Sequence, residues 1–264
     1  MIASSSVLES LHQSGYAVLD SHPVSKHLIL DSYQEWKRFF ASDSKFGFFP
    51  RKNCRSGYFE FQSEGVLGSQ TMDPKEYYQH YPRNFLPDAI RHTKKLLVDL
   101  EALGLALLDQ VQTELYEYLT MDLDESLSEL SSQSQGNLFR AHHYPGWDGE
   151  LRVGPHRDMF FLTISPTATE EGLEFQELSG NWKAVRSTPE SIVINVGQFL
   201  SEATGGYLPA PLHRVTGGAL SSRYTQHLFL SPKRDFQLSK KHRVTSFVTS
   251  QLKQEDLPKG DESE

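Results

Sequence analysis

Cysteine is nearly absent from this sequence of 264 residues, because Cys54 is the only one. A single cysteine cannot form an intramolecular disulfide, and it excludes a metal cluster held by several thiolates. Any metal site must therefore be built from histidine, aspartate or glutamate side chains. The reducing cytoplasm is the compartment that we expect for such a chain.

Long apolar runs and an excess of positive charge are also missing. No stretch approaches the roughly 18 consecutive apolar residues of a membrane span, and the first residues lack the basic start and apolar run of a secretory signal. Acidic residues outnumber basic ones by 34 to 26, which gives a net charge of −8, whereas nucleic-acid-binding proteins usually carry a basic face. We therefore expect no membrane and no nucleic-acid partner. We also expect the protein to be a monomer.

The first half of the chain has the apolar spacing of helices. Its pattern predicts helices over 5–13, 23–41 and 87–120, and Pro87 and Asp88 suit the first turn of the third one. The glycine-rich segment 45–70 is expected to be an irregular connection. A polar stretch over 121–136 marks the break between the halves.

In the second half of the chain, the apolar residues repeat at the shorter spacing that is typical of β-strands. Apolar or alternating runs, separated by glycine and proline, predict strands at 137–144, 158–164, 172–178, 182–186, 191–196, 211–216 and 223–230. So many short strands favour a β-barrel or sandwich. We therefore predict a helical region over 1–130 that packs on a β domain over 131–250, followed by a flexible tail over 251–264.

Three candidate metal ligands stand in the β half. His156 and Asp158 are two residues apart, so on a strand both would face the same way, and His213 opens a later predicted strand. Two imidazoles and one carboxylate form the facial ligand set of non-haem iron(II) oxygenases, which leaves metal positions open. Each residue alone also fits a structural role, as a hydrogen-bonded turn histidine, a capping aspartate or a surface histidine.

Arg223 and Thr225 form a second candidate pair. They can share one face of the predicted strand 223–230. A guanidinium fork beside a hydroxyl suits a carboxylate, and an inward arginine without an anionic partner would be costly to bury. A surface arginine on an edge strand is equally consistent with the pattern.

The blocks GPHRDMFFLTI, SIVINVGQF and RYTQHLFLSP resemble the core of the iron(II)/2-oxoglutarate-dependent oxygenases, in the branch that includes isopenicillin N synthase and the plant flavonoid and gibberellin oxygenases. The resemblance is strong over 137–232 and looser in the first half. It implies a mainly β fold with flanking helices around a double-stranded β-helix (jelly-roll, cupin-like). Matched position by position, it implies that iron(II) is bound at a catalytic centre of His156, Asp158 and His213.

The same resemblance implies a dioxygenase that hydroxylates a small molecule, in natural product biosynthesis, with O2 and 2-oxoglutarate as co-substrates and succinate as a product. Arg223 and Thr225 would bind the distal carboxylate of 2-oxoglutarate, and Tyr144 would lie near it. The family usually has serine where this chain has Thr225. Plant members often have asparagine where this chain has His142, so the role of that residue stays open.

The substrate is less well defined by the sequence. Arg140 and His142, if they face inward, would give the pocket positive character and favour a carboxylate-bearing substrate. Phe160 could line the pocket or belong to the barrel core, and His227 could contact substrate or be a satisfied interior histidine. The aromatic segment 47–70 could form a lid over the barrel mouth or a packed connection.

Three other functions remain compatible with these residues. The first is an oxidase of the isopenicillin N synthase type, which uses iron(II) and O2 without 2-oxoglutarate. The second is a non-enzymatic metal-binding barrel. The third is an oxygenase that acts on a protein. Succinate release coupled to substrate oxidation would separate the main interpretation from the first alternative.

Overall fold

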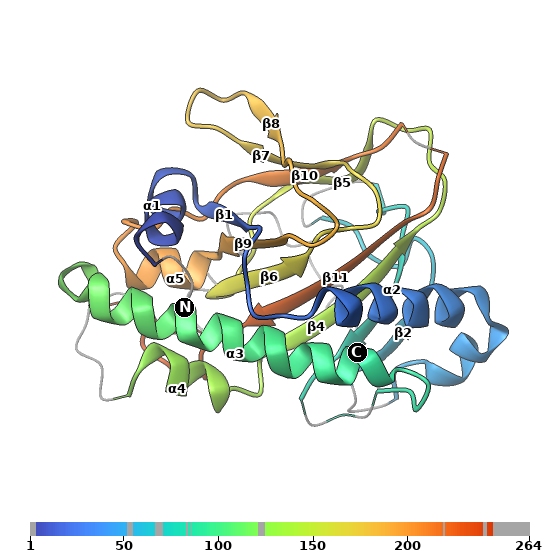
Figure 1. Cartoon of the computed structure of the whole chain (residues 1–264), viewed down its shortest axis with the longest axis horizontal. Helices are drawn as coiled ribbons and strands as arrows, with labels where there is room; N and C mark the ends of the chain where they lie inside the picture. The colour runs from blue at the N-terminus through green and yellow to red at the C-terminus, as the bar shows by residue number, and fades with distance from the viewer. Residues whose placement is uncertain are drawn as a thin grey trace, which may run out of the picture.

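Two antiparallel β-sheets face each other in the computed structural model, which describes residues 4–51, 55–66, 71–82, 84, 86–120, 125–218, 220–239 and 242–244 (Figure 1). The major sheet contains, in order, β1 (Tyr16–Leu19), β9 (Ile192–Val196), β6 (Leu162–Pro166), β11 (Arg223–Leu230), β4 (Leu138–Tyr144), β3 (Glu76–His80) and β2 (Gly57–Phe59). The minor sheet contains β5 (Leu151–His156), β10 (His213–Thr216), β7 (Leu173–Gln176) and β8 (Trp182–Ala184). This arrangement is the predicted mainly β, double-stranded β-helix core.

Two helices, α2 (Lys26–Ala41) and α3 (Arg91–Glu114), pack on the outer face of the major sheet, and α4 (Leu127–Ser132) packs on α3. The other helices are α1 (Ser4–Ser14), which contacts β1, and α5 (Gln198–Ala203), with 3-10 turns η1 (Asp43–Phe48) and η2 (Tyr116–Tyr118). In Figure 1, α2 and α3 run across this face. A Cβ on Gly104 of α3 would collide with Ile164 of β6 and Leu230 of β11, so glycine lets the helix approach the sheet closely. The helices thus bury one face of the sheet and leave its inner face for a site.

The long helix α3 begins later than the sequence pattern predicted. It starts at Arg91, and Pro87 lies outside its first turn. The reason is a cap from another helix: the buried Glu35 carboxylate of α2 accepts the backbone N–H groups of Arg91, His92 and Thr93. A carboxylate satisfies the free N–H groups of a helix start and suits its dipole.

The prediction of a helical first half was incomplete. The strands β1, β2 and β3 come from this half and join the major sheet, and β2 with η1 lies in the expected irregular connection. The polar break contains α4, which begins with a capping box of Ser126 and Glu129. The strands β3 and β2 extend the major sheet beyond β4. The first half also contributes to the cavity between the sheets, through residues such as Glu64, Val66 and Lys75.

The predicted strands of the second half are all present, most of them with tighter bounds. The strand expected at 158–164 begins only at Leu162, and β5 was not predicted at all. The expected tail over 251–264 lies outside the described residues.

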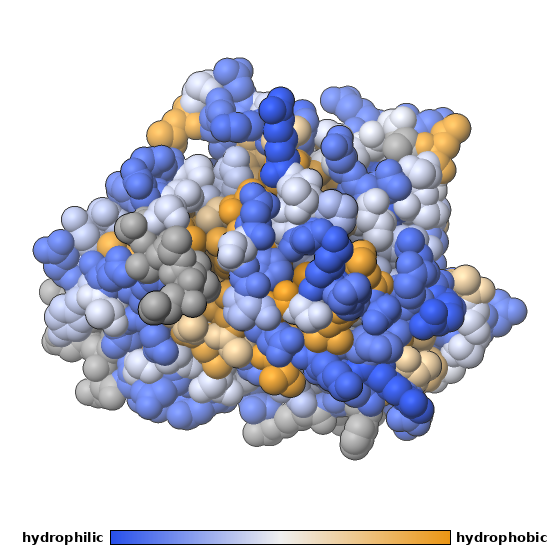
Figure 2. All heavy atoms as spheres, in the orientation of Figure 1, coloured by the Kyte–Doolittle hydropathy of each residue, from blue (hydrophilic) through white to orange (hydrophobic). Residues whose placement is uncertain are grey.

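The surface is mainly polar. Figure 2 shows hydrophilic side chains over most of one face, with apolar ones in separate patches. Within the described part of the chain, none of the helices combines the length and the apolar character that crossing a bilayer requires.

Candidate iron and 2-oxoglutarate site

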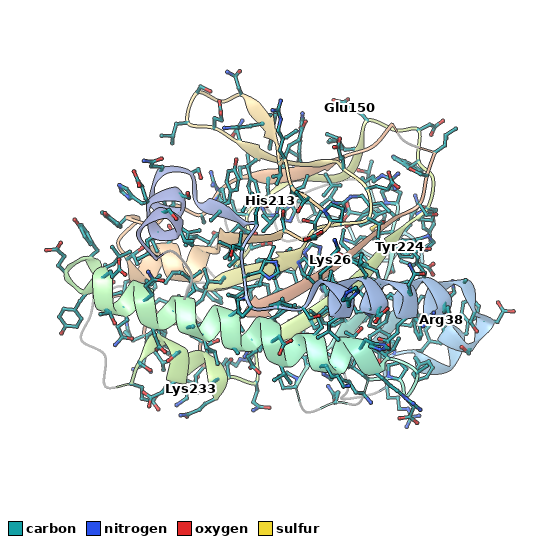
Figure 3. The ribbon with its side chains drawn as sticks, in the orientation of Figure 1. Lys26, Arg38, Glu150, His213, Tyr224 and Lys233 are labelled. Atoms are coloured by element: carbon teal, nitrogen blue, oxygen red, sulfur yellow. The ribbon has the colours of Figure 1, made fainter. Side chains whose placement is uncertain are left out.

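A cavity of about 660 Å³ opens between the two sheets, and residues of both line it. That size is typical of a pocket for a small molecule. His213 lies in the interior between the sheets, whereas Lys233 and Arg38 lie at the periphery (Figure 3). All three predicted metal ligands line the cavity, as do Tyr144 and Arg223.

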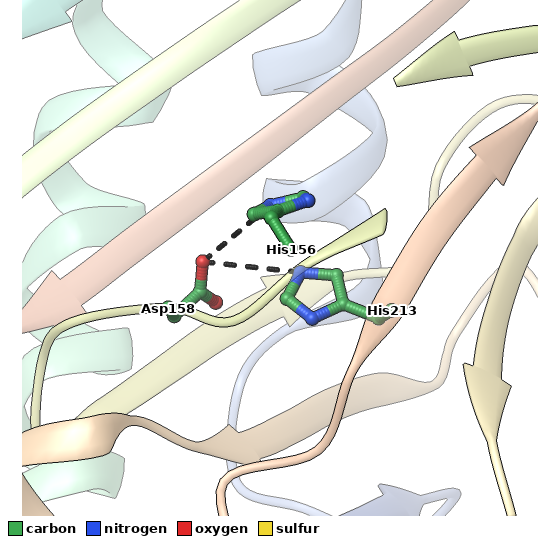
Figure 4. Close-up of side chains that lie close together, drawn as sticks. All are labelled: His156, Asp158 and His213. Atoms are coloured by element: carbon green, nitrogen blue, oxygen red, sulfur yellow. Dashed lines mark ion pairs between the residues drawn. The ribbon is translucent and has the colours of Figure 1, made fainter. Parts of the chain in front are cut away.

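The three predicted metal ligands converge on one point (Figure 4). His156 ends β5 and His213 begins β10, and the two residues are directly paired across the minor sheet. The Asp158 Oδ1 atom lies 3.8 Å from the Nε2 atom of each histidine, and the three ligand atoms lie within 4.8 Å of one another. Asp158 was expected on a strand with His156, but it lies in the connection after β5, which turns its carboxylate toward both imidazoles.

Backbone carbonyl groups fix the orientation of both imidazoles. The Nδ1 atom of His156 lies 3.0 Å from the Gly154 carbonyl oxygen, and that of His213 lies 3.3 Å from the Pro211 carbonyl oxygen. Because a carbonyl can only accept, each Nδ1 carries the hydrogen and each Nε2 keeps a lone pair for a metal. Burial lowers the pKa of His213 to about 4, so this ring is neutral near pH 7.

Two side chains that the sequence analysis did not single out orient the carboxylate. The Oδ2 atom of Asp158 accepts hydrogen bonds from Thr163 Oγ1 at 2.6 Å and from Asn195 Nδ2 at 3.0 Å, which leaves Oδ1 facing the imidazoles. Burial raises the pKa of Asp158, but the neighbouring histidines and these two hydrogen bonds outweigh burial and lower it to about 2. The site therefore presents a charged carboxylate and two imidazole nitrogens, a donor set that fits iron(II).

Arg223 lies at another end of the cavity. Its Nε donates to the carbonyl oxygens of Glu170 and Glu171, at 3.0 and 3.2 Å. Its two terminal nitrogens have no hydrogen-bond partner within the described residues, although the side chain is buried and lines the cavity. Tyr144, paired with it across β4 and β11, has its ring centre 5.6 Å from the guanidinium carbon. The two unpaired terminal nitrogens of Arg223 suit an anionic ligand such as a carboxylate.

Thr225 lies beside this end but does not belong to the cavity lining. Its hydroxyl lies 3.1 Å from His142 Nδ1 and 2.9 Å from His227 Nε2, and both of these histidines do line the cavity. The other nitrogen of His227 contacts Ser165 Oγ at 2.7 Å. His227 is therefore a fully hydrogen-bonded interior histidine, which was one of the two interpretations of the sequence.

The expected positive character of the pocket is largely compensated. Arg140 faces the cavity, but its two terminal nitrogens each donate to a Glu64 carboxylate oxygen at 3.0 Å. Lys75 is paired with Asp73 at 2.8 Å and with Glu64 at 3.2 Å. Burial holds the pKa of His142 well below its usual range, so this ring is neutral. Arg140 and His142 thus supply no free positive charge for a substrate carboxylate.

Phe160 also lines the cavity, with its ring centre 4.6 Å from that of Phe229. It precedes β6, although the sequence pattern predicted a strand over 158–164. The predicted lid 47–70 falls partly outside the described residues. Within its described part, Val66 packs on the buried cluster of Tyr144, Val153 and Val215 beside the cavity.

Comparison with known proteins gives a consistent picture. Residues 135–232 match the family model of the 2OG-Fe(II) oxygenase superfamily. The solved structure of an inferred oxygenase from Shewanella oneidensis has a TM-score of 0.85 and 31% identity, over 96% of this chain and 95% of that one. The dioxygenase for auxin oxidation 1 from Arabidopsis thaliana, solved with 2-oxoglutarate, has a TM-score of 0.73 and 20% identity over 90% of this chain and 91% of that one, which supports the fold alone.

The curated relatives are matched over different lengths. Gibberellin 20 oxidase 1 of Arabidopsis thaliana is 24% identical over 94% of this chain and 70% of its own length. A 2-oxoglutarate-dependent dioxygenase of Gibberella zeae is 39% identical, but the match spans 26% of this chain and 18% of that protein.

Proposed function

Because this chain belongs to the 2-oxoglutarate and iron(II)-dependent oxygenase superfamily, we propose that it is a dioxygenase that hydroxylates a small-molecule substrate. Iron(II), 2-oxoglutarate and O2, when bound together, supply the chemistry that replaces a C–H hydrogen by a hydroxyl group and releases succinate and CO2. The protein's residues bind and orient these partners. The cytoplasmic location, the monomeric state and the role in natural product biosynthesis stay predictions.

The observation that carries the proposal is the orientation of the three ligand side chains. His156 Nε2, Asp158 Oδ1 and His213 Nε2 all face one point, because their other polar atoms are hydrogen-bonded elsewhere. These residues would hold iron(II) on one face and leave the opposite positions for ligands. A structural metal site would instead be closed by protein ligands on all sides.

Arg223 would hold the distal carboxylate of 2-oxoglutarate. Its side chain lines the cavity, the Tyr144 ring lies beside its guanidinium group, and Thr225 is the next residue on the same face of β11. A bidentate arginine fixes the direction of a dicarboxylate, so the opposite end of the co-substrate would point toward the metal ligands. The walls of the cavity would exclude water from the reacting atoms.

The experiment that tests this function begins with anaerobic protein and iron(II). Adding 2-oxoglutarate should produce a weak visible absorption band that wild type shows and Asp158→Ala does not, because the variant loses a metal ligand. Asp148→Ala, which removes an exposed carboxylate outside the cavity lining, serves as the matched control and should keep the band. A wild-type protein that binds iron(II) but gives no band with 2-oxoglutarate would contradict the proposal.

A substrate screen that measures succinate then separates the dioxygenase from its nearest rival. Each substrate molecule oxidised should yield one succinate. Substrate oxidation at full rate without added 2-oxoglutarate would instead indicate an oxidase of the isopenicillin N synthase type, in which Arg223 would hold a substrate carboxylate.

A further inference from the structure

Four of the charged side chains that line the cavity already neutralise one another. Lys75 forms ion pairs with Asp73 and Glu64. Arg140 also pairs with Glu64, through both of its terminal nitrogens. A substrate anion that used either of these cations would have to compete with a protein carboxylate, so this side of the cavity does not select for negative charge.

The proposed metal and co-substrate account for two more charges of the lining. Iron(II) and the 2-oxoglutarate dianion carry equal and opposite charges, so together they leave the net charge of the cavity unchanged. Asp158 would bind the metal and Arg223 the distal carboxylate, and the charges of these two side chains also cancel. Among the described residues, Arg157 is then the one charged side chain of the lining that remains uncompensated.

Arg157 is anchored beside the metal site, but part of its guanidinium group is unused. In the sequence it lies between the ligands His156 and Asp158. Its Nη1 donates to the carbonyl oxygen of Ala210, three residues before His213. Its Nε and Nη2 form no hydrogen bond or ion pair with any residue that the structure describes. Because Arg157 is exposed and also lines the cavity, it lies where the cavity opens to solvent.

The cavity also offers an apolar surface to a ligand. Leu138 and Phe229 of the major sheet and Leu173 of the minor sheet line it. Phe160 lines it as well, with its ring centre 4.6 Å from that of Phe229. Apolar surface is stabilised when it leaves water for such surroundings. The lining therefore suits a molecule that combines an apolar body with one negative charge.

We propose that the substrate is a monoanionic organic acid, whose carboxylate is bound by Arg157 at the mouth of the cavity and whose apolar body lies inside. This inference rests on the proposed dioxygenase function and names the class of its substrate. An arginine suits a carboxylate because its planar fork can donate two parallel hydrogen bonds. Arg157 thus takes the part that the sequence analysis had considered for Arg140 and His142.

The test measures ligand affinity by calorimetric titration of anaerobic protein that is saturated with iron(II) and 2-oxoglutarate, so that Arg223 is already occupied. The probes are benzoate, cinnamate and octanoate, each compared with its uncharged primary amide. At least one acid should bind about fivefold more tightly than its amide, which is the upper end of the range for a solvent-exposed ion pair. Added salt should reduce this preference, because it screens exposed charges.

Variants of Arg157 separate its charge from its contact with the Ala210 carbonyl. Arg157→Gln removes the charge but can still donate to that oxygen, so it should abolish the preference for the acid and leave the affinity for the amide unchanged. Arg157→Lys keeps the charge and should retain most of the preference. Arg186→Gln removes an exposed arginine outside the cavity lining, and this control should bind both probes like wild type.

The outcomes distinguish this inference from the proposed function. A wild-type protein that gives the visible band with 2-oxoglutarate but prefers none of the acids to its amide would overturn the inference alone. Equal loss of acid and amide binding in Arg157→Gln would also overturn it, because Arg157 would then have only a structural role. A wild-type protein that binds iron(II) but no 2-oxoglutarate would overturn the proposed function, and the assigned substrate class with it.

Discussion

Replacing Thr163 by valine isolates one hydrogen bond to the metal-binding carboxylate. Valine keeps the branched shape in β6 and removes only the hydroxyl, which lies 2.6 Å from Asp158 Oδ2. A hydrogen bond to a charged group contributes about 1.5–3 kcal/mol, which corresponds to roughly 10- to 150-fold in an equilibrium constant. Asn195 still donates to the same oxygen at 3.0 Å. We therefore expect the lower end of this range, about a tenfold loss of iron(II) affinity.

The assay is an anaerobic iron(II) titration against a competing chelator. Thr167→Val is the matched control, because the Thr167 hydroxyl also donates at 2.9 Å, but to the Ser191 carbonyl oxygen. The control should bind iron(II) like wild type. If Thr163→Val did so as well while keeping its fold, the carboxylate would not depend on this hydrogen bond and the reasoning would be refuted.

The other predictions concern the co-substrate and the fold. Arg223→Ala should raise the 2-oxoglutarate concentration for half-maximal succinate release at least about tenfold without changing iron(II) affinity; an unchanged requirement would remove Arg223 from the site. Glu35→Gln should lower the free energy of unfolding by about 2 kcal/mol at neutral pH. Burial raises the pKa of Glu35, but its hydrogen bonds from the start of α3 outweigh burial and hold it below its usual value. Its contribution is thus present above the unfolded pKa of about 4.3 and lost as pH falls through the lower folded pKa, so the urea midpoints of wild type and variant should converge in acid; a constant difference would contradict this. Gly104→Val should lower the free energy of unfolding by about 1–3 kcal/mol, because the new side chain collides with Ile164 and Leu230. An unchanged thermal midpoint would contradict this, because it would mean that the sheet moves away from the helix at little energetic cost.

Much of the β core could be predicted from the sequence, because strand periodicity is local. The pair His156 and Asp158 was found from its spacing, even though Asp158 lies beyond the end of β5. Its hydrogen-bond partners Thr163 and Asn195 were missed. Both stand in segments that the sequence analysis had predicted to be strands, but their pairing across β6 and β9 sets their contact with the carboxylate.

The start of α3 could not be predicted for a related reason. Its cap is Glu35, which lies far earlier in the sequence, so no local signal marks Arg91 as the first residue. The beginning of α4 was different, since Ser126 and Glu129 form a capping box, which is a local signal that the sequence carries. The hydrogen-bond partners of Thr225 could not be predicted from local sequence, because only packing determines which side chains surround its hydroxyl.

The most direct test of the metal centre is anomalous X-ray scattering at the iron edge from an anaerobic crystal of the iron(II)-loaded protein. The account predicts one strong peak within bonding distance of His156 Nε2, Asp158 Oδ1 and His213 Nε2. A peak bound to other side chains, or one that leaves any of these three atoms without a bond to iron, would contradict it.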